Sequence, residues 1–258
     1  MSKTILIKKA IIIAGGLSSR LYPLTDEKPK CMLEVGGKTI LKREIEALQA
    51  CGVNDIVVVA GYKKEKINYP DIKYYNDNDH HQAPSILRGL LCAEQEMADG
   101  FICSYSDIIY NKSVVEKLLS APGDINLIVD TDWAKQYENR VKHPVNEAEL
   151  VQVKDNKVIR IGKKVVPEGS HGEFIGLALF SKKGAEILKS HYHRLLREYQ
   201  GKFNTPFQNA KEFQRAYLTD MIQELIDRGC SVFNVDIQEN WIEIDTDEDL
   251  EKARKLFS

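Results

Sequence analysis

The sequence lacks the cysteine pairs, the basic excess and the long apolar runs that mark several large classes of protein. Its five cysteines are widely spread and include no C-x-x-C pair, which argues against a disulfide framework or a zinc site and favours a reducing compartment. The formal net charge of −2 gives no electrostatic reason to expect nucleic acid or an anionic membrane as a partner. The apolar run near the N-terminus stops at Gly15, too short for a signal-peptide core or a membrane span. We therefore expect a cytoplasmic protein.

The segments that are present alternate between strand and helix patterns. Short β-branched runs within 8–16, 55–62 and 101–110 predict buried strands, and apolar residues at helical spacing within 36–52 and 85–100 predict the helices between them. Such alternation is typical of an α/β fold, here a Rossmann-like open, mixed and mostly parallel sheet flanked by helices.

The pattern is less regular after about residue 124. It predicts further strands, a hairpin and three helices, in the order 125–133, 148–164 (hairpin), 173–181, 182–200 (helix), 218–229 (helix), 231–237 and 247–257 (helix). We expect one domain over 1–258, with a nucleotide-binding half over about 1–124 and an acceptor-binding half over about 125–258.

The stretch AGGLSSRLYPLTDEKPKCML, residues 14–33, places glycines at the end of the first predicted strand, where open α/β sheets bind ligands. A Rossmann dinucleotide loop is excluded because G-G-L-S-S-R does not have the G-x-G-x-x-G spacing. A P-loop ending in GGKT would require a glycine at the position of Met32, so that segment is better explained as a turn that opens a helix. The remaining interpretation is a triphosphate loop in which Arg20 grips two phosphate oxygens and Lys30 supplies a point charge.

The same stretch resembles the signature of the nucleotidyltransferases that make CDP-alcohols and NDP-sugars, roughly A-G-G-x-G-[ST]-R-x-x-P-L-T-x-x-x-P-K. The resemblance covers the chain well to about residue 110, and Ser18 stands where the family usually has glycine. It implies that the loop residues contact a nucleoside triphosphate: Ala14, Gly15, Gly16, Leu17, Ser18, Ser19, Arg20 and Lys30.

The resemblance also implies a Mg²⁺ site. Asp107, at the end of the third predicted strand, matches the family's metal-binding aspartate, and Asp245 in WIEIDTDEDL is the best match for a second one. Carboxylate oxygens and substrate phosphates are the ligands that Mg²⁺ prefers. The alternatives are a strand-end turn for Asp107 and a helix N-terminus for Asp245, where carboxylates are generally favoured.

Base and acceptor contacts are assigned less firmly. Gln82 and Ser85 fall where the family reads the base, although Ser85 is equally placed to cap a helix. The GEFIGL segment and the preceding D-x-x-W…R…HP pattern resemble choline-phosphate and phosphonate cytidylyltransferases. Four residues are therefore candidates to contact the acceptor: Lys163, Glu173, Trp133 and Arg140.

These features predict a Mg²⁺-dependent cytidylyltransferase that uses CTP and a small phosphate or phosphonate acceptor, with Arg20, Lys30, Asp107 and Lys163 as catalytic residues. Two alternatives remain: a uridylyl- or thymidylyltransferase for a sugar 1-phosphate, and a nucleotide-binding regulatory protein without activity. The sequence has no heptad run that would indicate a coiled-coil dimer, and a homo-oligomer formed in another way is possible.

Overall fold

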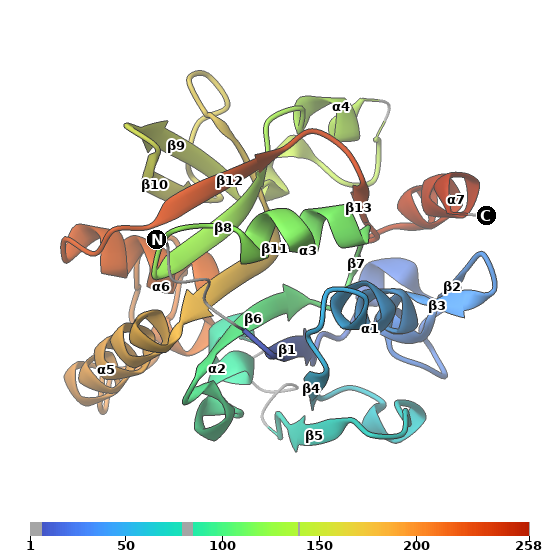
Figure 1. Cartoon of the computed structure of the whole chain (residues 1–258), viewed down its shortest axis with the longest axis horizontal. Helices are drawn as coiled ribbons and strands as arrows, with labels where there is room; N and C mark the ends of the chain where they lie inside the picture. The colour runs from blue at the N-terminus through green and yellow to red at the C-terminus, as the bar shows by residue number, and fades with distance from the viewer. Residues whose placement is uncertain (1–6, 79–84, 139, 258) are drawn as a thin grey trace.

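A mixed sheet of nine strands forms the centre of the molecule (Figure 1). The computed structural model describes residues 7–78, 85–138 and 140–257, and the strand order within them is β5-β4-β1-β6-β11-β8-β12-β10-β9. The strands are β1 (Lys9–Ala14), β4 (Asp55–Ala60), β5 (Lys73–Asn76), β6 (Gly100–Tyr105), β8 (Ile125–Asp130), β9 (Leu150–Lys154), β10 (Lys157–Gly162), β11 (Gly172–Ser181) and β12 (Phe233–Ile237). Two small ladders accompany the sheet: β2 (Glu34–Val35) with β3 (Lys38–Thr39), and β7 (Ile108–Tyr110) with β13 (Trp241–Glu243).

The open mixed sheet predicted from the sequence is confirmed, and its parallel part lies mainly in the N-terminal half. Strand β1 runs parallel to β4 and β6, and β4 runs parallel to β5. Among the described residues of the other half, β8 and β12 are the one pair that runs parallel, whereas β11 is antiparallel to β6, β8 and β9. Strand β11 thus joins the two predicted halves into one sheet; their division near residue 124 stays a prediction.

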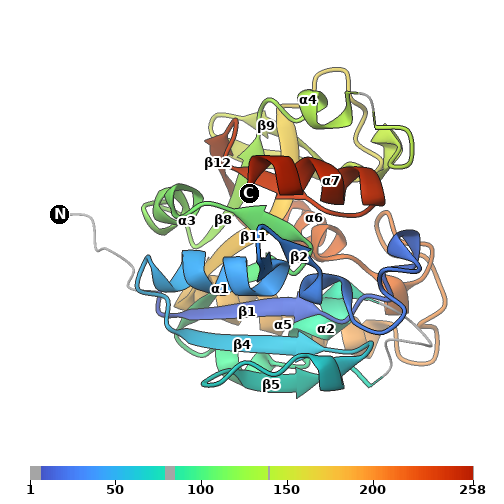
Figure 2. The same cartoon turned by 90° about the vertical axis from the view of Figure 1, so that its right-hand side faces the viewer.

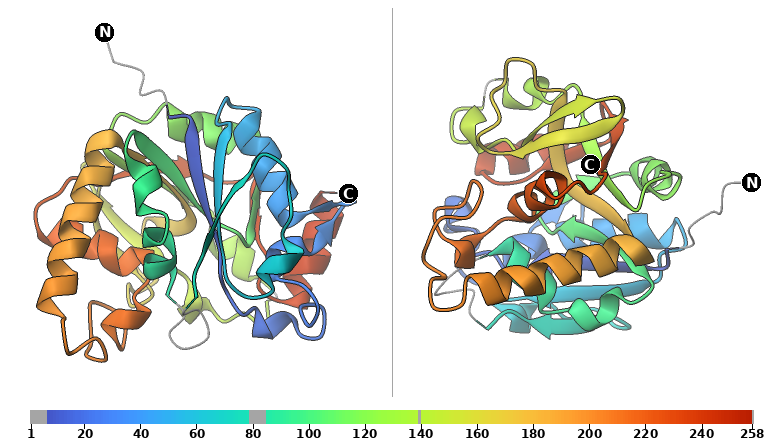
Figure 3. Two further views of the ribbon diagram at one scale, coloured as in Figure 1. Left: turned by 90° about the horizontal axis from the view of Figure 1, so that it is seen from below. Right: turned by 90° about the vertical axis from the view of Figure 1, so that its left-hand side faces the viewer.

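Helices cover both faces of this sheet (Figures 2 and 3). They are α1 (Ile40–Gln49), α2 (Ile86–Leu91), α3 (Lys112–Leu119), α4 (Ala134–Tyr137), α5 (Lys182–Glu198), α6 (Leu218–Asp227) and α7 (Asp247–Leu256). Along β1, Ile11 belongs to the core shared with α2, α5 and α6, and Ile12 to the core shared with α1 and α3. Because both faces of the strand are buried, the run is continuously apolar rather than alternating.

The GGKT segment forms a hairpin turn rather than a P-loop, as the sequence indicated. Gly36 and Gly37 lie between β2 and β3 with φ angles of 55° and 73°, a left-handed conformation that glycine adopts without steric cost. The Thr39 hydroxyl then accepts a hydrogen bond from the Lys42 amide at 3.0 Å and caps α1. This turn therefore starts a helix and places no glycine loop around a phosphate.

The segment 101–110, predicted as one strand, is divided in the structure. Strand β6 ends at Tyr105, and β7 starts at Ile108 and leaves the sheet to pair with β13. The Ile244 amide donates to the Asp107 carbonyl at 2.8 Å, just beyond this ladder. The division puts Asp107 in a turn and brings the segment around Asp245 alongside it.

Candidate active site

The loop after β1 keeps its glycine-type geometry although Ser18 replaces glycine. Ser18 has φ 55° and ψ 36°, in the left-handed region that non-glycine residues adopt at some steric cost. Its carbonyl accepts hydrogen bonds from the Thr25 hydroxyl at 3.0 Å and from the Leu21 amide at 3.2 Å. These two bonds hold the backbone in the conformation that the family signature encodes with glycine.

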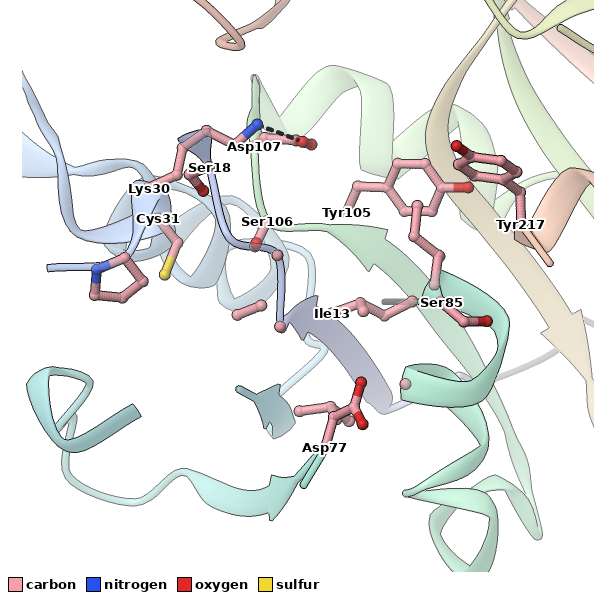
Figure 4. Close-up of a pocket in the computed structure, with 17 residues that line it drawn as sticks. Ile13, Ser18, Lys30, Cys31, Asp77, Ser85, Tyr105, Ser106, Asp107 and Tyr217 are labelled. Atoms are coloured by element: carbon pink, nitrogen blue, oxygen red, sulfur yellow. Dashed lines mark hydrogen bonds and ion pairs between the residues drawn. The ribbon is translucent and has the colours of Figure 1, made fainter. Parts of the chain in front are cut away.

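A first cavity of about 260 Å³ opens beside this loop, at the carboxyl ends of β1, β4 and β6 (Figure 4). Of the predicted nucleotide contacts, its lining contains Ala14, Gly15, Gly16, Ser18, Lys30 and Ser85. Leu17, Ser19 and Arg20 lie outside this lining, and Gln82 lies outside the described residues. The Ser85 hydroxyl accepts from the Arg88 amide at 3.1 Å and donates to the Ala216 carbonyl at 2.7 Å, which is the helix-cap alternative.

Sequence reasoning missed several residues of the first cavity. Asp77, just after β5, and Tyr105, Ser106 and Tyr217 also line it. The Asp77 carboxylate accepts a hydrogen bond from Arg88 at 3.0 Å. Asp77 could not be found from the predicted strands, because β5 was not among them, and Tyr217 reaches the cavity only through the tertiary packing of α6.

An ion network of four predicted residues lies beside the first cavity, whose lining includes two of them, Lys30 and Asp107. Lys30 Nζ binds Asp107 Oδ2 at 2.8 Å and also binds Asp245 Oδ1, while Arg20 Nη2 binds Asp245 Oδ2 at 2.6 Å. Burial opposes the charge of Lys30, but Asp107 and Asp245 outweigh it and raise the pKa of Lys30. Burial likewise disfavours the Asp245 carboxylate, but Lys30 and then Arg20 hold its pKa well below the usual range. The structure thus brings together residues that lie far apart in the sequence.

The two aspartates suit Mg²⁺. Asp107 Oδ1 is buried and has no hydrogen-bond partner among the described residues, so this oxygen is available as a ligand for a metal ion. Asp107 and Asp245 both touch the Lys30 ammonium, which shows that their carboxylates converge on one cation position. Hard carboxylate oxygens are the donor set that Mg²⁺ prefers.

A second cavity of about 240 Å³ adjoins the first and shares four of its lining residues, among them Asp107 and Tyr217. It also contains Arg20 and the predicted acceptor residues Lys163 and Glu173. Four further charged or titratable residues of its lining were not predicted: His143, Glu147, Glu149 and Glu243. Asp245 also lines it and was predicted as a metal ligand. Glu243 and Asp245 alternate along one extended segment, and this spacing was the signal that both point the same way.

Lys163 and Glu173 are held apart from each other in this second cavity. Lys163 Nζ binds Glu147 at 2.8 Å and lies 4.6 Å from the centre of the Tyr217 ring. Burial disfavours its charge, but Glu149 and Glu147 raise the pKa of Lys163, so the ammonium stays protonated. Glu173 accepts a hydrogen bond from the Tyr137 hydroxyl at 2.6 Å, and burial followed by repulsion from Glu243 raises its pKa.

Trp133 and Arg140 lie outside the linings of both cavities. Trp133 is 9% exposed and packs edge-on against Tyr137, with ring centres 5.8 Å apart, in a small apolar cluster. Arg140 Nε binds Asp249 at 2.6 Å, and its guanidinium covers the Tyr137 ring at 5.0 Å. Both side chains pack the wall behind the second cavity, so their predicted acceptor contact gains no support from the geometry.

The fold and the site define a nucleotidyltransferase. Residues 10–155 match the family model described as the MobA-like NTP transferase domain, and the chain belongs to this family. Over 253 residues it is 34% identical to a CTP:phosphoglutamine cytidylyltransferase of Campylobacter jejuni, covering 94% of this chain and 97% of that protein. The predicted family and enzyme class, a nucleotidyltransferase related to cytidylyltransferases, are confirmed.

Solved structures share the whole fold. The inositol-1-phosphate CTP transferase of T. maritima aligns with a TM-score of 0.75 at 19% identity, covering 100% of this chain and 96% of that one. The CTP:phosphocholine cytidylyltransferase of Streptococcus pneumoniae aligns with a TM-score of 0.71 at 23% identity, covering 97% and 99%. Among the described residues, no helix combines the length and the apolar character needed to cross a membrane.

Proposed function

We propose that this protein transfers CMP from CTP to the phosphate or phosphonate group of a small acceptor and releases pyrophosphate. The observation that carries the proposal is the meeting of Arg20, Lys30, Asp107 and Asp245 where the two cavities join. The similarity to the C. jejuni cytidylyltransferase over nearly the whole chain supports CTP as the donor and a phosphorylated acceptor.

In this proposal the first cavity holds CTP. The backbone from Gly15 to Ser18 leaves room for the triphosphate, because glycine carries no side chain to obstruct it. Lys30 and Arg20 exchange their aspartate partners for phosphate oxygens when the nucleotide binds, so that little charge is left unpaired. The base contact predicted for Gln82 stays a prediction, and Ser85 acts as the cap of α2.

Asp107 and Asp245 would hold Mg²⁺ beside the triphosphate. When bound, the ion supplies positive charge to phosphate oxygens that become more negative during transfer. The two aspartates carry the charge needed to hold it, and Asp107 has a free buried oxygen for this purpose. Lys30 lies between the same carboxylates, so with Mg²⁺ held there its ammonium would be available to bind a phosphate oxygen of the nucleotide.

The transfer is a single displacement. An acceptor phosphate oxygen forms a bond to the α-phosphorus, and the bond from this phosphorus to the bridging oxygen breaks, so that the electron pair leaves with pyrophosphate. The acceptor oxygen is already ionised near neutral pH, so no side chain has to remove a proton. Catalysis then consists of positioning and charge neutralisation by Lys30, Arg20 and Lys163.

The second cavity receives the acceptor. Lys163 is placed to bind its phosphate or phosphonate group, because this ammonium stays charged within the lining. Glu173, a buried carboxyl group with a raised pKa that already accepts a hydrogen bond from Tyr137, is placed to form a hydrogen bond with an amine or hydroxyl of the acceptor. This pair of groups fits a small, zwitterionic or hydroxylated phosphate monoester or phosphonate.

Pyrophosphate release with CTP, UTP and dTTP tests the proposal against a panel of acceptors. Phosphoglutamine, phosphocholine, a small alkyl phosphonate and glucose 1-phosphate span the classes that the relatives and the cavity suggest. We expect turnover with CTP and one of the first three. Turnover only with UTP or dTTP and the sugar phosphate would replace the proposal by the sugar alternative, and binding of CTP without turnover on any acceptor would favour the regulatory protein.

A further inference from the structure

His143 is a buried histidine that the proposed transfer does not use. Its side chain is 2% exposed, and its Nδ1 has no hydrogen-bond partner among the described residues. This nitrogen nevertheless faces three carboxylates, at 3.6 Å from Glu243 Oε2 and 3.9 Å from both Asp245 Oδ2 and Asp249 Oδ2. Buried polar atoms are nearly always paired, so an unpaired nitrogen aimed at carboxylates calls for an explanation.

The spacing of these atoms is that of ligands around one ion. One atom each from His143, Glu243 and Asp245 lies within 4.8 Å of the other two. Neighbouring ligands about 2.1 Å from an octahedral metal ion are about 3.0 Å apart, so the three side chains would draw together around an ion. The nearest measured pair, His143 Nδ1 and Glu243 Oε2, is 3.6 Å apart.

Asp245 belongs both to this cluster and to the proposed Mg²⁺ position. Its Oδ1 faces Lys30 and the Asp107 side, whereas its Oδ2 faces Arg20 and His143. A carboxylate whose two oxygens face different cation positions is the arrangement of a two-metal site. Glu243 is further oriented by Arg140, whose Nη2 lies 3.4 Å from its Oε2.

The carboxylates that line the second cavity are a reason to expect a cation there. Its lining carries the carboxylates of Glu147, Glu149 and Glu173 in addition to Glu243 and Asp245. An acceptor phosphate entering this surface meets carboxylates that Lys163 and Arg20, already bound to Glu147 and Asp245, do not balance. A divalent cation between His143 and the two carboxylates would supply the missing positive charge on the acceptor side.

We propose that His143, Glu243 and Asp245 bind a second divalent cation, of the transition-metal type exemplified by Mn²⁺. An imidazole nitrogen with two carboxylates is a mixed donor set, and imidazole ligands favour transition metals over Mg²⁺. The role of the ion in binding the acceptor phosphate rests on the proposed function. The existence of the site does not, and it is tested without nucleotide or acceptor.

The test is a Mn²⁺ titration of the nucleotide-free protein, followed by electron paramagnetic resonance, with electron spin-echo modulation to detect nitrogen bound to Mn²⁺. We expect bound Mn²⁺ with imidazole nitrogen coupling. In His143→Gln the coupling disappears and the affinity falls at least about tenfold, as expected for loss of a ligand. The matched control is His193→Gln, which changes a histidine that is 45% exposed and paired with Glu94; it should leave both readings unchanged.

Absence of nitrogen coupling in the unmodified protein would overturn the proposal, whatever the variants do, and so would unchanged affinity and coupling in His143→Gln. Asp107→Asn separates the two metal positions, because it removes a ligand of the Mg²⁺ position only and should leave the nitrogen coupling in place. Failure of the CTP assay with retained nitrogen coupling would refute the proposed function alone, and the reverse result would refute this site alone.

Discussion

Asp107 and Asp245 share one ammonium group, since Lys30 Nζ binds a carboxylate oxygen of each. One aspartate follows β6 and the other follows β13, and the ladder between β7 and β13 keeps them adjacent. Lys30 thus neutralises the pair when no other cation is near. This relationship makes the charge balance of the site, rather than the presence of any one residue, the property to test.

Lys30→Met should destabilise the metal-free protein as well as abolish turnover. The substitution leaves the partly buried Asp107 carboxylate without its lysine partner and leaves Asp245 with Arg20 alone; the two carboxylate side chains are 25% and 12% exposed. Breaking a buried ion pair by removing one partner costs on the order of 3–5 kcal/mol, and these exposures place the effect at the low end. Urea unfolding with and without Mg²⁺ measures it, and Mg²⁺ should restore more stability to the variant than to the original protein.

Lys183→Met is the control for that experiment, because Lys183 is 72% exposed and pairs with Asp124 at the surface. It should change stability by less than about 1 kcal/mol. Equal metal-free stability of Lys30→Met and the original protein would contradict the shared-ammonium role.

Under the proposed function, Asp107→Asn should lower the rate of pyrophosphate release at least about 100-fold while the fold is retained, because the amide keeps the shape of the side chain but loses the charge that would hold Mg²⁺. Steady-state rates at saturating CTP and Mg²⁺ measure the loss, and circular dichroism checks the fold. Asp71→Asn is a matched control: Asp71 is exposed and has φ 61°, a conformation that asparagine tolerates. A variant at Asp107 with the original rate would remove this residue from the metal site.

Lys163→Met should raise the KM for the acceptor about tenfold or more and leave the KM for CTP within about threefold, because Lys163 lines only the second cavity. Initial-rate kinetics with each substrate varied in turn separate the two constants. The neighbouring Lys164→Met is exposed and serves as the control. If the KM for CTP rose as much as that for the acceptor, Lys163 would instead contact the nucleotide.

Glu96 should make stability depend on pH in acid. Burial disfavours its charge, but hydrogen bonds from Lys73, Lys9 and Tyr75 lower the pKa of Glu96 to about 2 from an ordinary value of 4.5. Because the folded-state pKa is lowered, the stabilisation is present in full above pH 4.5 and is lost as the pH falls toward 2.

The free energy of unfolding of Glu96→Gln should therefore lie below that of the original protein at pH 7, and the two curves should converge near pH 2. Denaturant unfolding across this range provides the comparison, with the exposed Glu116→Gln as the control. A difference that stayed constant from pH 7 to pH 2 would show that the charge of Glu96 is not its source.

The parts of the site that could be predicted from the sequence are those encoded by contiguous residues. The loop from Ala14 to Lys30 has its motif in one stretch, and Asp107 and Asp245 follow recognisable strand patterns. The break between β6 and β7 could not be predicted, because the apolar residues 108–110 continue a strand pattern and only the distant partner β13 draws them away from the sheet. The antiparallel course of β11 is likewise decided by its neighbours.

Trp133 and Arg140 show the same limit for side chains. Both were plausible acceptor contacts by residue type, yet Trp133 packs on Tyr137, and Arg140 is taken by Asp249 on α7. His143 was missed for the converse reason, since nothing beside it in the sequence indicates that Glu243 and Asp245 face it. Which buried polar groups pair with each other depends on tertiary contacts, and these cannot be read from a local sequence pattern.

The β7–β13 ladder determines when the two halves of the site can meet as the chain is synthesised. The phosphate loop and Asp107 emerge from the ribosome early, but the strand that delivers Asp245 follows α6 and β12. The two aspartates that share Lys30 therefore become neighbours only when β13, the last strand of the chain, pairs with β7. Under the proposed function, CMP transfer would have to wait for that pairing.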